Sequence, residues 1–190
     1  VDALYIASQI VVAIQALITR RTNPLESILI GIGKLDAGTA YNVVAEEAAM
    51  EGTIRVFSPE LRKATKERIE LVASSIAAMY GGTVSIEWKD FTSPLINDEE
   101  STLEVRKVLT SVFGKDSVVE SRTPSLGGDD FAEYILKVPG CYAFVGSRNP
   151  EVPETGVAHH NSHFDVDDGA LSVMVNLMSS YAIEFLNGEL

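Results

Sequence analysis

Apolar and polar positions in the first third of the chain follow a helical and then a strand pattern. Residues 3–19 are almost continuously apolar, and Asp2 in front of them suits a helix N-cap, so we expect a mostly buried helix. Asn23-Pro24 ends it, because the residue before a proline disfavours the helical backbone. Residues 27–35 and 48–57 resemble strands and are expected to pair as a hairpin.

The next segment returns to a helical period and then to alternation. Ser58-Pro59 predicts a helix start, and Gly81-Gly82 predicts its end. One apolar face is expected at Ile69, Val72, Ile76 and Met79, and the charged residues within 62–70 are expected to be a solvated face. Residues 83–89 alternate like a third strand. The order αββαβ, preceded by one further strand, would be a split βαββαβ sandwich.

The pattern changes after Pro94. Residues 99–113 and 169–186 predict two helices, and residues 129–136 predict a short one. Residues 141–145 form a continuous apolar run, as expected of a strand buried on both faces, and residues 147–168 resemble a loop. This alternation predicts part of a layered α/β domain.

Charge separates the two parts of the chain. The 190 residues carry a formal net charge of −12, so we expect no nucleic-acid partner. Residues 1–92 have a net charge of −2, and residues 93–190 have −10. The longest apolar stretch, 10–18, is too short for a bilayer, so we expect no membrane span. The single cysteine and the lack of a signal-peptide pattern predict a cytoplasmic location.

The three histidines fall within five residues, with aspartates directly after them: His159, His160, His163, Asp165, Asp167 and Asp168. Imidazole and carboxylate are ligands of zinc and similar divalent ions. A solvated loop that happens to be rich in histidine explains the pattern equally well. His159 and His163 would share one face of a helix, but the glycine, asparagine and serine around them favour a loop.

Two further places could carry chemistry. Gly127-Gly128 precede a predicted helix start, which would expose backbone N–H groups to an anion or substrate; a well-capped helix is the simpler explanation. Arg55 on the second predicted strand has a planar fork suited to a carboxylate, and Asn42 lies in the preceding turn. Arg55 could instead pair on the surface with an acidic neighbour, namely Glu46, Glu47 or Glu51.

Taken in order, several short motifs resemble one family. They are Gly38-Thr39-Ala40-Tyr41-Asn42, Glu51-Gly52-Thr53-Ile54-Arg55, Ser125-Leu126-Gly127-Gly128-Asp129-Asp130-Phe131, Pro139-Gly140, and His160-x-x-x-Phe164 followed by Asp167-Asp168. Together they resemble the amidohydrolase branch of the aminoacylase and glutamate-carboxypeptidase metallopeptidases. This branch includes N-acyl-amino-acid amidohydrolases, hippurate hydrolases, auxin-conjugate hydrolases and N-acetyl-diaminopimelate deacetylases. The resemblance runs over nearly all of the sequence.

The resemblance implies a fold in two parts. Residues 1–92 would be a lid or dimerisation domain, a ferredoxin-like βαββαβ sandwich without its first strand. Residues 93–190 would be the C-terminal part of a zinc-peptidase-like α/β sandwich. A homodimer through the lid is expected. The family's N-terminal catalytic segment, with the general base and most metal ligands, is not in this sequence, so we expect the chain to be incomplete and inactive alone.

The resemblance also implies the chemistry and the site residues. The expected activity is hydrolysis of the amide bond of an N-acyl amino acid or small peptide-like conjugate, with two divalent metal ions. Zinc is expected, with manganese, cobalt or nickel as alternatives. His160 would bind a metal ion, Asn42, Arg55, Gly127 and Gly128 would bind substrate, and no catalytic residue is expected in this chain. A non-catalytic ferredoxin-like module that dimerises or binds a small ligand is the competing hypothesis.

Overall fold

The first helix forms where the apolar run and its cap predict it. In the computed structural model, which describes residues 1–119 and 123–190, helix α1 covers Ala3–Arg21. The backbone N–H of Tyr5 donates to Asp2 Oδ1 at 3.1 Å, which confirms the predicted N-cap. One stripe of the helix is buried, and three to four residues separate its members, Ile6, Ile10, Ile14 and Leu17.

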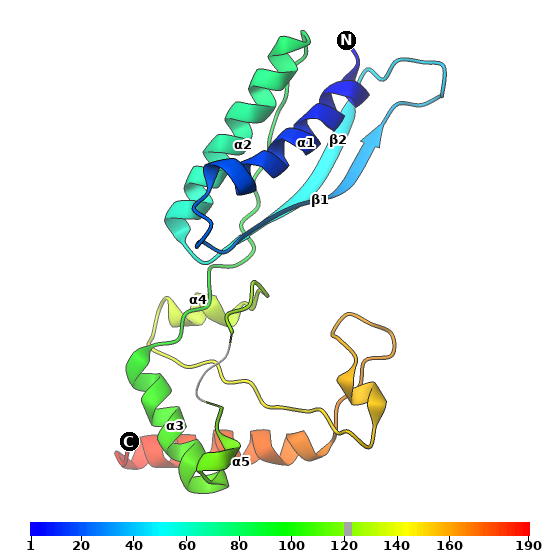
Figure 1. Ribbon diagram of the computed structural model, residues 1–190. Coiled ribbons are helices and arrows are strands. Elements are labelled where there is room, and N and C mark those ends of the chain that lie inside the picture. Colours follow the sequence, from blue (N-terminus) through cyan, green and yellow to red (C-terminus); the bar gives the residue numbers. More distant parts are fainter. Residues whose placement is uncertain (120–122) are drawn as a thin grey trace. The chain divides into compact units, whose positions relative to one another are not determined.

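The predicted hairpin is confirmed. Strand β1 (Ile28–Ala37) pairs antiparallel with β2 (Ala48–Val56), from Ile28 opposite Val56 to Ala37 opposite Ala48, with an irregularity between Ile32 and Lys34. Helix α2 (Pro59–Met79) begins after Ser58, whose hydroxyl accepts from the Leu61 N–H. Figure 1 shows α1 and α2 side by side along the hairpin. Their shared core includes Ile10, Ile30, Ile69 and Ala73.

Two expectations for this region need correction. Residues 83–89 are extended but form no strand. Their alternation is real, since Val84, Ile86 and Trp88 pack against the core. A ladder additionally requires a neighbouring strand, and among the described residues no strand pairs with this segment. Met79 on α2 is 67% exposed, because the buried stripe of that helix runs through Ile69, Ala73 and Ala77 instead.

The helices of the following region lie where the sequence predicts them. They are α3 (Glu99–Phe113), a 3₁₀ turn at Lys115–Ser117, α4 (Phe131–Ile135), a 3₁₀ turn at Pro153–Gly156, and α5 (Gly169–Asn187). Helix α3 packs on α5, with Val108 fully buried. The Tyr181 hydroxyl on α5 donates to Glu104 on α3 at 2.8 Å.

The strand expected at residues 141–145 is absent, although the whole segment is described. A side chain takes the place of a neighbouring strand here. Asn97 Nδ2 donates to the Tyr142 carbonyl at 3.0 Å, and the Tyr142 N–H donates to Asn97 Oδ1 at 2.9 Å. One asparagine side chain therefore bonds both backbone groups of Tyr142 in this apolar run.

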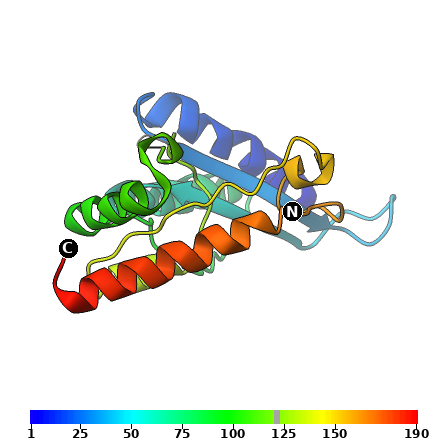
Figure 2. The same ribbon diagram turned by 90° about the horizontal axis from the view of Figure 1, so that it is seen from below.

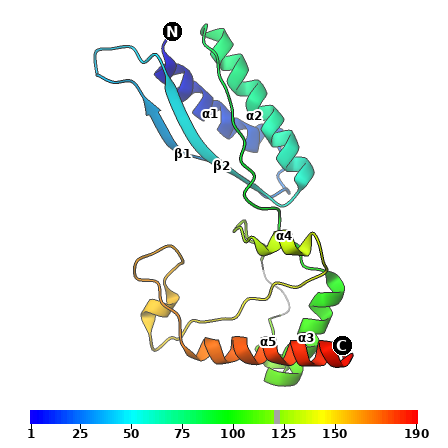
Figure 3. The same cartoon turned by 180° about the vertical axis from the view of Figure 1, so that it is seen from behind.

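The contacts divide the chain into two units. Unit 1 comprises residues 1–95 and 125–132, and unit 2 comprises residues 96–124 and 133–190. The segment Ser125–Ala132 thus belongs with the hairpin and α1, although its sequence neighbours belong to unit 2. Figures 2 and 3 show the same elements from below and from behind.

Helices α1 and α5 are both long and apolar enough to cross a bilayer by length and composition alone. The apolar stretch 10–18 is shorter than a membrane span, whereas the helix that contains it and α5 are each 19 residues long. For α1, the buried stripe facing the hairpin and α2 indicates a core helix of a folded unit. Core helices and membrane spans share this composition, so length does not separate them.

Candidate functional site

The structure brings Arg55 to the glycine loop, the segment of residues 125–130 that contains Gly127 and Gly128. Arg55 lies on β2, and its Nη1 donates to the Leu126 carbonyl at 2.9 Å. The two residues are far apart in sequence, but both belong to unit 1. Arg55 is exposed, and a guanidinium has further N–H donors beyond the one used on Leu126. The guanidinium can therefore still donate hydrogen bonds to a carboxylate beside this loop.

The surface ion pair considered for Arg55 is not seen. Among the described residues, no ion pair joins Arg55 to Glu46, Glu47 or Glu51. Glu51 instead accepts from Lys34 Nζ across the hairpin at 2.8 Å. Hydrogen bonds from Lys34 to Glu51 and Asp36 raise the pKa of that lysine above its ordinary value.

Asn42 lies at the other end of the hairpin. It belongs to the connection between β1 and β2, beyond the last pair of Ala37 with Ala48, whereas Arg55 lies opposite Leu29. At about 3.3 Å per residue, the strand from Ala48 to Arg55 is roughly 23 Å long. Within a single chain, the hairpin therefore holds Asn42 and Arg55 apart by about the length of one strand. Figure 1 shows this connection as the cyan loop extending beyond the strands.

The connection itself is hollowed. Asn42 lines an open hollow of about 650 Å³ between residues 37–45 of the connection and the start of α1 at Asp2 and Leu4. The Ala3 N–H donates to the Ala45 carbonyl at 2.9 Å, which attaches the connection to the helix start. Gly38 has φ of +74°, a conformation that favours glycine where the connection leaves β1.

The glycines of the second motif have specific packing roles. The Gly127 N–H donates to the Ser125 hydroxyl at 3.1 Å, so this donor is used within the loop. A Cβ at Gly128 would lie 3.2 Å from Thr92 Cγ2, so glycine permits a close approach there. The Phe131 N–H donates to Asp129 Oδ1 at 2.9 Å at the start of α4. The capped-helix explanation therefore accounts for Asp129, although α4 is only five residues long.

The histidines lie on an exposed loop, which excludes the helix-face chelate of His159 and His163. The ring of His159 packs against Phe164, with centroids 4.7 Å apart, and the His163 N–H donates to Asn161 Oδ1. His160 has φ of +62°, the left-handed conformation that non-glycine residues rarely adopt. Its imidazole suits one metal ligand. Within residues 1–119 and 123–190, no three histidine, cysteine or acidic side chains cluster to complete a metal site.

The aspartates that follow the histidines have different surroundings. Asp167 accepts from Asn149 Nδ2 at 2.6 Å and from the Gly169 N–H at 2.7 Å. These hydrogen bonds lower the pKa of Asp167 and stabilise its carboxylate. Asp167 therefore holds the loop to the start of α5, which is a structural role.

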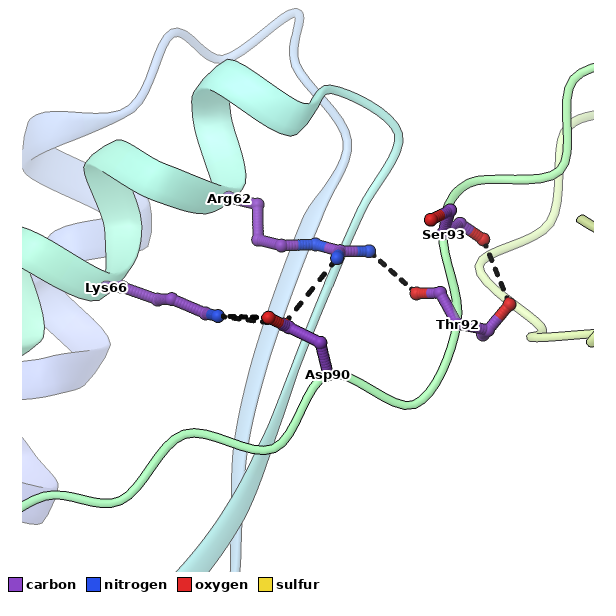
Figure 4. Close-up of polar contacts among 5 residues, drawn as sticks. All are labelled: Arg62, Lys66, Asp90, Thr92 and Ser93. Atoms are coloured by element: carbon purple, nitrogen blue, oxygen red, sulfur yellow. Dashed lines mark hydrogen bonds and ion pairs between the residues drawn. The ribbon is translucent and has the colours of Figure 1, made fainter. Parts of the chain in front are cut away.

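Sequence reasoning missed one polar cluster, shown in Figure 4. Lys66 Nζ donates to Asp90 Oδ1 at 2.7 Å, and Arg62 Nη1 lies 3.6 Å from the same oxygen. The Lys66 contact lowers the pKa of Asp90. Arg62 and Lys66 were expected on a solvated face, yet their side chains are only 25% and 22% exposed. Their spacing of four on one helix face was the available signal.

Comparison with known proteins places these features in a family. The family described as "Peptidase family M20/M25/M40" matches residues 6–184 of this chain. Thermostable carboxypeptidase 2 of Saccharolobus solfataricus is 34% identical over 98% of this chain and 47% of its own length. N-acetyl-L-cysteine deacetylase of Bacillus subtilis is 33% identical over 90% of this chain and 39% of its own length.

A solved structure agrees with these relatives. It is a dinuclear metal-binding peptidase of the M20 family from Bacillus subtilis, with a TM-score of 0.74 and 28% identity. That match covers 98% of this chain and 47% of the other. The chain spans about half the length of the curated relatives it matches. The matched range includes the hairpin, the glycine loop and the histidine loop, and the chain therefore belongs to peptidase family M20/M25/M40.

Proposed function

We propose that this chain supplies the lid and the C-terminal part of the catalytic domain of a metal-dependent amidohydrolase. The substrate would be an N-acyl amino acid or a small peptide-like conjugate. The family match over residues 6–184 carries the proposal, because it includes residues of both units. Two relatives are named a carboxypeptidase and a deacetylase, and both names describe hydrolysis of an amide bond. A dimerisation module alone would not require the match through the histidine loop.

The proposed fold of unit 1 is the ferredoxin-like sandwich. Residues 83–89 are extended, pack three apolar side chains on the core and begin beside the N-terminus, since Val1 lies 3.3 Å from a Cβ built at Gly82. The start of α1 is also bonded to the connection that leads into β2, since the Ala3 N–H donates to the Ala45 carbonyl. A strand leading into α1 would fit between β2 and residues 83–89. It would run antiparallel to both and complete the βαββαβ order.

The proposed site roles follow the family resemblance. His160 would bind one of two divalent ions, with zinc expected, and such ions activate water for attack on an amide. Arg55 would bind the substrate carboxylate, and Asn42, Gly127 and Gly128 would contribute further contacts. His160 alone does not complete a metal site among the described residues. The remaining ligands and the general base would come from residues outside this sequence.

The proposed assembly is a homodimer through unit 1. Apolar side chains of α1 remain exposed, with Val12 at 70%, Leu4 at 48% and Tyr5 at 47%. Contact with a second copy would cover this surface. Light scattering at tens of micromolar checks this, and a monomer would contradict it. The proposed location is the cytoplasm, which suits a chain with one free cysteine.

Metal analysis and hydrolysis assays test the proposed function in the complete enzyme. We expect hydrolysis of N-acyl amino acids that chelator abolishes and divalent ions restore. His160→Ala should lose one metal equivalent and most activity, whereas His163→Ala should have a mild effect, because the family resemblance assigns the metal ligand to His160. Greater loss in His163→Ala would assign the ligand to that residue instead.

A further inference from the structure

The glycine loop is attached to the rest of unit 1 at three points. Arg55 on β2 donates to the Leu126 carbonyl, and the Thr92 hydroxyl donates to the Asp129 carbonyl at 2.9 Å. Between these bonds, the Gly128 backbone packs on the Thr92 methyl group. The contacts come from a strand and from residue 92, which lies far from the loop in sequence. The loop position therefore depends on two residues of unit 1 outside the loop, Arg55 and Thr92.

Thr92 is itself held in place by α2, as Figure 4 shows. Arg62 Nη2 donates to the Thr92 carbonyl at 2.7 Å, and Asp90, which accepts from Lys66, lies beside the same guanidinium. The Thr92 hydroxyl also lies 3.2 Å from the Ser93 carbonyl. The bond to Asp129 is the shorter of the two and therefore receives the larger share of the single hydroxyl proton.

We propose that Thr92, oriented by Arg62, is a positioning residue that holds the Ser125–Ala132 loop beside Arg55. The inference rests on the proposed function, in which this loop and Arg55 bind substrate together. Asp129 is the residue through which Thr92 acts, because its carbonyl accepts from Thr92 while its carboxylate accepts from the Phe131 N–H. Thr92 thereby fixes the end of the loop opposite Leu126. The two anchors leave the glycines between them in one defined position.

Hydrogen exchange of the 190-residue chain tests the attachment without any assay of activity. Thr92→Val keeps the methyl contact with Gly128 and removes the hydroxyl. We expect exchange of the hydrogen-bonded Gly127 and Phe131 amides to accelerate about five- to tenfold, as the loss of one net hydrogen bond implies. Thr92→Ser restores the hydroxyl but not the methyl group, and should return exchange most of the way to the wild-type rate.

Thr22→Val is the matched control. Its hydroxyl donates to the Leu17 carbonyl at 3.0 Å in the same unit and does not bond the loop. This variant should leave amides 125–131 unchanged. Unchanged exchange in Thr92→Val, no restoration in Thr92→Ser, or equal acceleration in Thr22→Val would each overturn the attachment.

Kinetics of the complete enzyme test the positioning role. Thr92→Val should raise KM for a free-acid substrate roughly three- to tenfold while kcat changes less than about twofold, because a displaced loop weakens binding more than chemistry. Thr92→Ser should restore KM. If exchange accelerates but KM does not change, the positioning role is wrong. If no N-acyl amino acid is hydrolysed by the wild type, the proposed function fails while the exchange result still reports on the attachment.

Discussion

The two units differ in how completely their helices are covered. In unit 1, α1 and α2 bury matched stripes against one hairpin, and the core includes Ile10 and Ile14, each 3% exposed. In unit 2, α5 is rich in apolar residues, but many of them are exposed. Val175, Met178 and Ile183 are 60–71% exposed. Helices of equal length and similar composition thus have opposite surroundings.

The difference shows that helix composition alone does not create a core. A stripe of apolar residues is stabilised only where another element covers it, and α1 obtains that cover from β1, β2 and α2. Helix α5 contacts α3, and the described part of unit 2 contains no sheet to cover the rest of its surface. Unit 1 should therefore carry most of the folding free energy of this chain.

Paired isoleucine substitutions should show the largest contrast. Ile10→Ala on α1 should lower the free energy of unfolding by about 2–5 kcal/mol, because it leaves a cavity in the core. Ile183→Ala on α5 should change it by less than about 0.5 kcal/mol, since that side chain is 60% exposed. Urea unfolding followed by circular dichroism measures both. Equal losses would mean that α5 is covered in solution.

A smaller effect is expected from Arg55→Ala, which tests whether unit 1 also contributes to substrate binding. Arg55→Ala in the complete enzyme should lower kcat/KM for a free-acid substrate by about 2–4 kcal/mol, because the carboxylate loses its guanidinium partner. The loss should shrink when that carboxylate is amidated. Similar losses for acid and amide would leave Arg55 only its bond to Leu126, and place substrate recognition elsewhere.

The smallest effect is expected in the pH dependence of stability, which we compare between the starts of α3 and α5 in unit 2. Asp98 caps α3, and hydrogen bonds from the backbone and hydroxyl of Ser101 lower its pKa below the ordinary value of 3.8. Because its pKa is lowered in the folded state, the ionised Asp98 stabilises the protein above the ordinary value of 3.8. This stabilisation is lost as the pH falls through the folded-state pKa. Asp98→Asn cannot titrate, so its stability should fall less than the wild type between pH 5 and pH 3.

Asp168 is the control for this comparison, because it makes no side-chain capping bond at the start of α5. Asp168→Asn should follow the wild-type pH dependence in denaturant midpoints measured at both pH values. A flattened profile in Asp168→Asn, or an unchanged one in Asp98→Asn, would contradict the assigned difference between the helices.

Local signals in the sequence predicted most helices and the hairpin. Asp2 and Ser58 cap the helices they precede, because capping involves residues only three positions apart. The strand prediction failed at residues 83–89 and 141–145, where alternation or an apolar run was present without a neighbouring backbone. Such a neighbour comes from distant sequence, and no local pattern reports it.

The sequence by itself determined the motifs, their order and the family resemblance, since these depend on residue identity and spacing. Only the tertiary structure decided which motifs meet. It separated Asn42 from Arg55 by the length of a strand, and it brought Arg55 and Thr92 to opposite ends of the glycine loop. The physical reason is that contacts between distant segments depend on how the elements pack, and one strand register or one hydroxyl direction changes which groups touch.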